Sequence, residues 1–235
     1  GGMRAVAAGL SDVGKERKHN EDRYILLPEF GVFVVADGMG GHQSGEVASR
    51  MAASTVAGYF RSSKNGSVRD SPVSALSDAN AKIFARADDS RAHRGMGTTI
   101  VAAAYCPGDA MLYIAHAGDS RCYRVRDGRM EQLTRDHSLL QDALLERPDL
   151  TESDLAYLPR NVITRALGIG PSVELDVRAE PVRAGDCFLL CSDGLHGLVT
   201  DEDIVKIVVN APTLTEACQA LIQRANANGG KDNVT

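Results

Sequence analysis

Short apolar runs and longer amphipathic stretches follow one another in blocks along this chain. Residues 44–60 place apolar side chains at helical spacing, and a second such stretch follows Ser71-Pro72, where serine suits a helix cap and proline the first turn. Two further helices are expected after Thr200 and Thr213, each of which has an acidic residue three positions later. Strands are predicted from short runs rich in β-branched residues at 23–27, 31–36, 98–105, 111–117, 121–126, 129–133, 173–182 and 186–191.

Strands and helices come in blocks and not in strict βαβ alternation, which predicts an α+β fold with mainly antiparallel sheet. The helix pairs at 44–91 and 201–227 are expected to cover opposite faces of two stacked sheets. Asp127-Gly128 is expected to form the turn of a hairpin. No internal repeat or linker divides the chain, so residues 3–235 are expected to form one domain.

Composition places the chain among globular proteins with a real core. Of its 235 residues, 43% are hydrophobic and 24% are charged. The formal charge of -5 argues against nucleic acid as the main partner. No apolar stretch approaches the roughly 18 residues needed to cross a bilayer, and no signal-peptide pattern occurs. Five cysteines without a Cys-x-x-Cys pair fit reduced thiols, so the cytoplasm is the expected location.

The two ends of the sequence also allow predictions. Gly1 and Gly2 precede Met3 and resemble an expression scar, so they are left out of the fold prediction. The chain stops at Thr235, where the pattern predicts that a strand begins. A strand that is truncated or disordered after this point is therefore expected, and further domains are compatible with it.

Aspartates stand beside glycines where three of the predicted strands end, and a fourth follows a glycine pair near the end of the chain. Any one Asp-Gly pair is by itself typical of a hairpin turn. Carboxylates at several strand ends can nevertheless converge on one point, where their mutual repulsion requires neutralising cations. Oxygen ligands select hard ions such as magnesium, manganese or calcium. The four aspartates are Asp37, Asp119, Asp193 and Asp232.

Two loops near the N-terminus add candidate ligands for phosphate and metal. Arg17 offers a planar fork of donors suited to phosphate, and Glu21 and Asp22 could ligate a metal or hold its water. An exposed charged loop would have the same composition. Three glycines within four positions follow Asp37, which allows the backbone to approach an ion, so the Gly38 carbonyl is a candidate ligand. This glycine run lacks the spacing of nucleotide-binding loops.

Together these motifs resemble the metal-dependent serine/threonine protein phosphatases of the type-2C family, in their bacterial form. Eight matches occur in the family's order between residues 11 and 235, which makes coincidence a poor explanation. The matching segments are Arg17…Asn20-Glu21-Asp22, Asp37-Gly38-Met39-Gly40-Gly41-His42, Gly97-Thr98-Thr99, Gly118-Asp119-Ser120-Arg121, Asp136-His137-Ser138, Ile163-Thr164-Arg165-Ala166-Leu167-Gly168, Ser192-Asp193-Gly194-Leu195 and Asp232-Asn233-Val234.

The resemblance implies a central β-sandwich with a helix pair on each side, in four layers, and a metal cluster in a cleft at one end. It also implies two tightly bound Mn²⁺ or Mg²⁺ ions and a third, weaker one that matters for turnover. The residues carried over are Asp37, Asp193 and Asp232 for the first ion, Asp37 and the Gly38 carbonyl with Glu21 or Asp22 through water for the second, and Asp119 with Asp193 for the third.

The implied reaction is hydrolysis of phosphoserine and phosphothreonine by a metal-activated water, without a phosphoenzyme, while Arg17 grips two phosphoryl oxygens. Animal members place a histidine, the acid for the leaving group, directly after Asp-Gly. Here Met39 occupies that position and His42 is the nearest histidine, so His42 is the candidate general acid. A structural histidine, with a metal-bound water as the acid, is the alternative. His137 is interpreted as structural.

Three segments carry weaker patterns. Residues 4–10 alternate only weakly, and 61–70 read as a polar loop. Residues 138–158 are weakly helical and polar, with Pro148 interrupting them. The region of about 138–161 resembles the flap of bacterial members, a mobile cover near the cleft that is linked with substrate choice. A solvated linker is the other interpretation of this segment.

The leading hypothesis is therefore a cytoplasmic phosphatase that acts as a monomer on phosphorylated proteins, among them a serine/threonine kinase whose action it opposes. The alternative is a pseudophosphatase, a folded module that binds phosphoproteins without turnover. Every acid that matches a metal ligand is present, which argues against that alternative. A calcium-binding structural protein would need a dense Asp-x-Asp-x-Asp-Gly loop, and the sequence has none.

Overall fold

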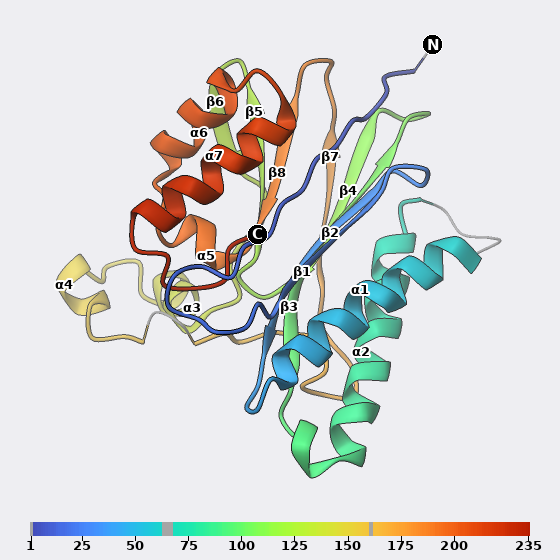
Figure 1. Cartoon of the computed structure of the whole chain (residues 1–235), viewed down its shortest axis with the longest axis vertical. Coiled ribbons are helices and arrows are strands. Elements are labelled where there is room, and N and C mark those ends of the chain that lie inside the picture. The colour runs from blue at the N-terminus through green and yellow to red at the C-terminus, as the bar shows by residue number, and fades with distance from the viewer. Residues whose placement is uncertain (1, 63–67, 160–161) are drawn as a thin grey trace.

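Two antiparallel sheets stacked against each other form the centre of the computed structural model, which describes residues 2–62, 68–159 and 162–235 (Figure 1). The strands are β1 (Asp22–Leu27), β2 (Val32–Met39), β3 (Gly97–Cys106), β4 (Met111–Ala117), β5 (Arg121–Arg126), β6 (Arg129–Gln132), β7 (Asp176–Pro181) and β8 (Cys187–Cys191). One sheet has the order β1-β2-β3-β4-β7 and the other the order β6-β5-β8. Every pairing in these two sheets is antiparallel, as the sequence predicts.

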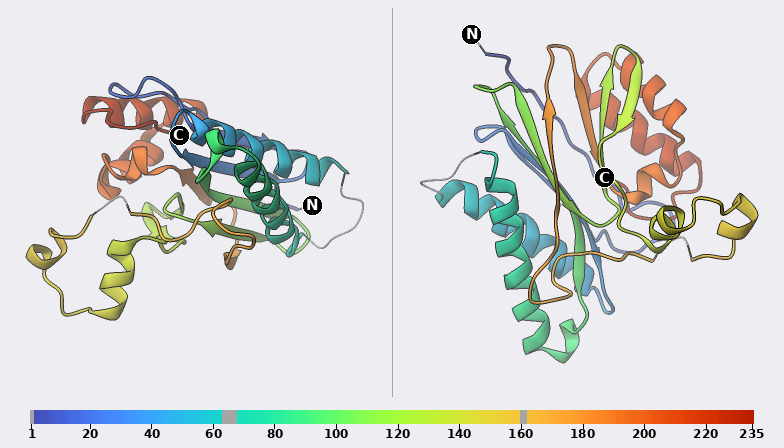
Figure 2. Two further views of the ribbon diagram at one scale, coloured as in Figure 1. Left: turned by 90° about the horizontal axis from the view of Figure 1, so that it is seen from below. Right: turned by 180° about the vertical axis from the view of Figure 1, so that it is seen from behind.

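Pairs of helices cover the outer face of each sheet, and other helices lie outside these pairs. They are α1 (Ser44–Ser62), α2 (Ser71–Asp89), η1 (Arg91–His93), α3 (Leu139–Glu146), α4 (Glu152–Leu155), α5 (Asp193–His196), α6 (Asp201–Asn210) and α7 (Leu214–Ala227). The pair α1 and α2 covers the five-stranded sheet, and α6 and α7 cover the three-stranded sheet (Figures 1 and 2). The predicted four-layer α+β sandwich is therefore confirmed. Among the described residues, no helix combines the length and apolar character that a membrane crossing requires.

Strand β3 shows why the central runs are continuously apolar. Ile100 and Ala102 belong to the core beneath α1 and α2, whereas Val101 and Ala103 belong to the core between the two sheets. Successive side chains of a strand point to opposite faces, so a strand with a core on each side needs apolar residues at every position. A third core, which contains Tyr123, lies between the smaller sheet and its helices.

Local signals in the sequence locate one hairpin turn and two helix caps correctly. Asp127 and Gly128 both have positive φ, 53° and 74°, as the two-residue hairpin between β5 and β6 requires. The side chains of Thr200 and Thr213 accept hydrogen bonds from the backbone N–H three positions later and cap α6 and α7. These features depend on a few neighbouring residues, which is why the sequence is sufficient to predict them.

Two local predictions need correction. The strand predicted at 173–182 begins only at Asp176, because Val173 and Leu175 pack against the core beneath α1 and α2. The weakly alternating residues 4–10, for which no element is predicted, form no strand and run between the two sheets (Figure 1). Helix α2 begins at Ser71 itself, so Asp70 and not Ser71 precedes it. Gly1 and the parts of two predicted loops at 63–67 and 160–161 lie outside the described residues.

The segment that matches the predicted flap forms two short helices, α3 and α4, which stand apart from the four layers (Figure 2). Pro148 lies between them, as the sequence predicts. The segment buries little surface, since the side chains of Leu145 and Tyr157 are 51% and 89% exposed. The loop-helix form is thus confirmed, and the function of a cover near the cleft stays a prediction.

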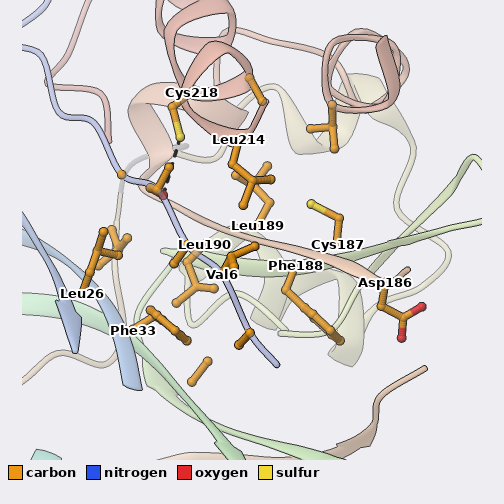
Figure 3. A pocket seen from close by; sticks show the side chains of 18 of the residues that line it. Val6, Leu26, Phe33, Asp186, Cys187, Phe188, Leu189, Leu190, Leu214 and Cys218 are labelled. Atoms are coloured by element: carbon orange, nitrogen blue, oxygen red, sulfur yellow. Dashed lines mark hydrogen bonds between the residues drawn. The ribbon is translucent and has the colours of Figure 1, made fainter. Parts of the chain in front are cut away.

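A cavity of about 630 Å³ lies between the sheets, beside the N-terminal segment (Figure 3). Its wall is mainly apolar and includes Phe33 of β2, Phe188 and Leu190 of β8, and Leu214 of α7. None of the acids predicted to bind metal lines it. This cavity is therefore a feature of the sandwich interior, separate from the candidate site.

Candidate metal and phosphate site

The first two acids of the site face each other across two neighbouring strands. Asp22 begins β1 and is the register partner of Asp37 near the end of β2. Directly opposed residues of an antiparallel pair bring their Cβ atoms to about 4.5–5.5 Å from each other, so their carboxylates share one region. Asp22 is buried, and one of its carboxylate oxygens accepts a hydrogen bond from the Thr235 hydroxyl at 2.8 Å.

Asp193 is the acid to which the others are coupled. Burial raises the pKa of Asp37 well above its usual range, and repulsion by Asp22 and Asp193 raises it further. Burial, with a smaller contribution from Asp193, raises the pKa of Asp22 to about 6 and that of Asp119 to about 7. The pKa of Asp232 is raised by the same two causes. Acids from four separate segments of the chain therefore lie within electrostatic reach of one carboxylate.

The buried side chain of Asn233 joins the loop that contains Arg17 to Asp232, the residue before it in the chain. The Asn233 amide donates to the carbonyls of Val13 and His19, both at 2.9 Å. Its oxygen accepts from the backbone N–H of Glu21 at 2.9 Å. The side chain thus fixes this loop beside Asp232. No function for Asn233 is predicted from the sequence, although its position directly after a predicted ligand is a usable signal.

The donor set fits a divalent cation that prefers oxygen. Four carboxylate oxygens in this region are buried and have no hydrogen-bond partner among the described residues, a costly state unless a cation neutralises them. Hard ions such as Mg²⁺ and Mn²⁺ prefer such oxygen ligands. The four atoms are Glu21 Oε2, Asp22 Oδ1, Asp119 Oδ1 and Asp193 Oδ1.

The acids expected to share one ion are close but not yet at ligand distance. Among the described residues, Asp37, Asp193 and Asp232 do not bring one oxygen each within 4.8 Å of one another. Oxygens that bind one Mg²⁺ at about 2.1 Å lie at most about 4.2 Å apart. Metal binding by these three residues would therefore require their side chains to move.

Glycines allow the backbone to come close to the acids. A Cβ atom on Gly38 would stand 1.8 Å from the carbonyl oxygen of Gly45, and a Cβ on Gly45 would stand 2.2 Å from Glu21 Oε2. No side chain larger than hydrogen fits at either position without displacement of its neighbours. The predicted use of the Gly38 carbonyl as a ligand is compatible with this close approach and stays a prediction.

The two residues predicted to contact substrate differ in how firmly the structure connects them to the acids. Arg17 Nε lies 3.5 Å from Asp232 Oδ1, and the Arg17 side chain is 57% exposed. His42 lies in the exposed turn between β2 and α1 with a φ of 52°. None of the hydrogen bonds or ion pairs of the described residues involves its ring. Its assignment as general acid therefore stays a prediction.

Comparison with known proteins identifies the family. Residues 15–233 match the model of the family described as protein phosphatase 2C. This chain belongs to the protein phosphatase 2C family. Within that family, the chain is 35% identical over 233 residues to the serine/threonine phosphatase stp of Listeria innocua, and the match covers 96% of this chain and 91% of that protein. The predicted resemblance is thus confirmed.

Solved structures of relatives agree with the fold of this protein phosphatase 2C chain. The crystal structure of the Mycobacterium tuberculosis serine/threonine phosphatase PstP/Ppp superposes with a TM-score of 0.86 at 36% identity and covers 97% of this chain and 94% of that one. The catalytic domain of PstP has also been solved in complex with two manganese ions, with a TM-score of 0.83 at 35% identity and the same coverage. Family membership and this complex support dependence on divalent metal.

Proposed function

We propose that this protein hydrolyses phosphoserine and phosphothreonine in other proteins with the aid of Mn²⁺ or Mg²⁺. The observation that carries the proposal is the convergence of acids on Asp193, which adds to the effect of burial in raising the pKa of Asp22, Asp37, Asp119 and Asp232. In its ionised form such a cluster is costly unless cations neutralise it. Family membership supplies the reaction, since the relatives are serine/threonine phosphatases.

In this proposal the acids hold three ions. Asp37, Asp193 and Asp232 hold the first, and Asp37 with the Gly38 carbonyl holds the second, assisted by Glu21 or Asp22. Asp119 and Asp193 hold a third, weaker ion. Bound divalent ions supply two effects, a lower pKa of the attacking water and neutralisation of phosphoryl charge.

Arg17 would bind the phosphate group in this scheme. Its Nε lies 3.5 Å from Asp232 Oδ1 and its side chain is 57% exposed, so the guanidinium is accessible to phosphoryl oxygens. The contact with Asp232 places this cation beside the acid cluster. A general acid for the leaving serine or threonine would come from His42 or from solvent.

The same residues argue against the alternative of a pseudophosphatase that only binds phosphoproteins. Every acid assigned to an ion is present, and the described structure brings these acids into one region. We further propose that the substrates include a serine/threonine kinase and that the protein works as a monomer in the cytoplasm. All five cysteines, which lie in the described parts of the chain, are free, as expected for a reducing compartment.

The first experiment measures release of phosphate from a phosphothreonine peptide in the presence of Mn²⁺. We expect turnover that is lost on addition of a chelator and in the Asp193→Asn variant. The chelator removes the cations, and the variant removes a carboxylate that would bind them. Equal background rates in all three samples would instead support a binding module without catalysis. Binding of the unhydrolysed peptide, measured by fluorescence anisotropy, separates that case from a misfolded protein.

Substitution of Arg17 tests the phosphate contact. Charge-assisted hydrogen bonds contribute about 1.5–3 kcal/mol, so Arg17→Ala is expected to lower kcat/KM by about 10- to 150-fold. It should also weaken inhibition by inorganic phosphate, whereas Arg17→Lys should retain part of both effects. Steady-state kinetics with phosphate as inhibitor measures them. Lys18→Ala, at the exposed neighbouring position, is the control, and an unchanged phosphate inhibition constant in Arg17→Ala would contradict the assignment.

A further inference from the structure

Two buried or half-buried histidines hold the backbone of the segment that presents Asp119. The N–H of Gly118 donates to His137 Nδ1 at 3.0 Å, and the Gly118 carbonyl accepts from the backbone N–H of His137 at 3.0 Å. The carbonyl of Asp119 accepts from His196 Nε2 at 2.7 Å. His196 lies on α5, which begins with Asp193. His196 therefore connects the backbone of Asp119 to the helix that begins with Asp193, and His137 holds Gly118, the residue before Asp119.

The carboxylate of Asp119 depends on its backbone for its direction. Asp119 is 8% exposed, and its Oδ1 has no hydrogen-bond partner among the described residues. No side chain in the described structure donates a hydrogen bond to this carboxylate. Gly118 has a φ of 112°, and a Cβ there would stand 2.6 Å from Cβ of Thr99, so the backbone has little freedom. The backbone position thus decides where the carboxylate points.

The ring of His137 is itself held in one orientation and one tautomer. Because Nδ1 accepts from an amide, the proton of the neutral ring lies on Nε2, which donates to Asp176 Oδ2 at 2.8 Å. Arg165 donates to the other oxygen of Asp176 at 3.1 Å. His116 stacks on the ring with centroids 4.5 Å apart and an angle of 4° between the planes. His116 and Asp176 are register partners on β4 and β7, so the sheet fixes this arrangement.

A metal site formed by His116, His137 and Asp176 explains these contacts less well, although their ligand atoms lie within 4.8 Å of one another. A ligand histidine normally coordinates through one nitrogen and donates the N–H of the other. His137 has the reverse arrangement, since its second nitrogen accepts the amide proton of Gly118. The guanidinium of Arg165 already neutralises Asp176. These three residues therefore fit a hydrogen-bonded structural cluster better than a metal site.

We propose that His137 is a positioning residue for Asp119: its Nδ1, oriented by Asp176 and the stacked His116, holds the Gly118 amide so that the Asp119 carboxylate faces Asp193. The inference rests on the proposed assignment of a third, weaker ion to Asp119 and Asp193. His137 contacts neither substrate nor ion in this scheme. It acts through two backbone atoms.

A pair of substitutions separates this function from simple packing. In His137→Asn the amide oxygen can occupy the place of Nδ1 and accept from Gly118, whereas in His137→Gln the amide reaches the place of Nε2 and Asp176. Both variants lose the stacked ring. If His137 served only in packing, the two variants would have the same defect. Changes of groups that orient metal ligands typically weaken metal affinity by about 10- to 100-fold, which is the loss expected for the third ion in His137→Gln.

Calorimetric titration of Mn²⁺ into the whole chain measures the weak and tight sites separately, and kinetics measures kcat and KM. We expect His137→Gln to lose weak-site affinity and kcat with little change in KM, and His137→Asn to retain more of both. Asp119→Asn should lose the weak ion and keep the tight ones, and His137→Gln should add nothing in that background. Thermal unfolding in chelator should show similar stability for the two His137 variants.

Several outcomes would overturn the inference. Equal defects in the two His137 variants, or additive losses with Asp119→Asn, would indicate a general packing function. Loss of a tight site from both His137 variants would indicate that the histidine is itself a ligand. If Asp119→Asn binds all ions like the unaltered protein, the third-ion assignment fails first and this inference fails with it. Retained hydrolysis and tight sites would then leave the proposed phosphatase function in place.

Discussion

Replacement of Asp37 by asparagine is expected to stabilise the metal-free protein and to abolish its activity. Burial and the charges of Asp22 and Asp193 raise the pKa of Asp37, so its ionised form is unfavourable in the folded state. A shift of one pKa unit corresponds to about 1.4 kcal/mol. The neutral amide removes this cost but also removes a ligand predicted for two ions. Loss of about 4 kcal/mol of charge stabilisation in the transition state would lower kcat about 1,000-fold.

The dependence on pH has a definite sign for Asp37. A carboxyl group with a raised pKa binds more protons in the folded state than in the unfolded state, so the free energy of unfolding falls as pH rises above about 4. At pH 7 this destabilisation is present in the metal-free wild type and absent in Asp37→Asn. The unfolding temperature in chelator should therefore be higher in the variant at pH 7, by about 2–4 °C for each kcal/mol, and the difference should shrink toward pH 4.

Metal should reverse the order of stability. A ligand present at 100 times its Kd stabilises the folded state by about 2.7 kcal/mol, so Mn²⁺ should raise the unfolding temperature of the wild type and have little effect on Asp37→Asn. Asp127→Asn is the matched control, because it makes the same chemical change in a hairpin turn outside the site. A variant that is less stable than the wild type in chelator, or that is still stabilised by Mn²⁺ to the same extent, would contradict the repulsion argument.

The second large effect is expected from Gly38→Ala. The new Cβ would meet the backbone oxygen of Gly45 at 1.8 Å, and a backbone atom cannot move aside as the end of a side chain can. Overpacking of this kind costs about 3 kcal/mol or more, which lowers the unfolding temperature of a chain of this length by about 6 °C or more. Displacement of the loop that begins α1 should also weaken Mn²⁺ binding.

Gly58→Ala is the matched control for Gly38→Ala. Gly58 lies inside α1, and nothing stands within 4 Å of the place where its Cβ would be. Alanine is more favourable than glycine in a helix interior by about 0.5–1 kcal/mol, so this variant should be slightly more stable and fully active. Thermal unfolding in chelator and phosphopeptide kinetics measure both variants. Equal stability of the two would show that the end of β2 is not close-packed against the start of α1.

Sequence and structure agree best where the decisive interactions are local. The hairpin at Asp127-Gly128 and the cap at Thr200 depend on residues within three positions of each other, and both are found as predicted. The strand predicted at 173–182 is wrong at its start, because Val173 and Leu175 pack on a core formed by distant helices. The apolar character of these residues was visible in the sequence, but the surface that they cover was not.

The candidate site divides in the same way. Motifs that follow the family pattern, such as those around Asp37 and Asp193, predict most of the acids of the candidate site. From the sequence, His137 is interpreted as structural and Asn233 has no predicted function, because their partners Gly118 and Glu21 are remote in the chain. Which acid lies at the centre of the cluster could not be inferred from motif order either.

By itself, the sequence determined the family, the α+β class and the identity of the acidic side chains, because turns, caps, periodicity and motifs are properties of nearby residues. Only the tertiary structure decided that Asp193 is the acid common to the cluster and that histidines from two other segments hold the backbone of Asp119. The physical reason is that electrostatic repulsion and hydrogen bonding depend on distances in space. Those distances are set by the order in which the strands pair within each sheet and by how the two sheets stack.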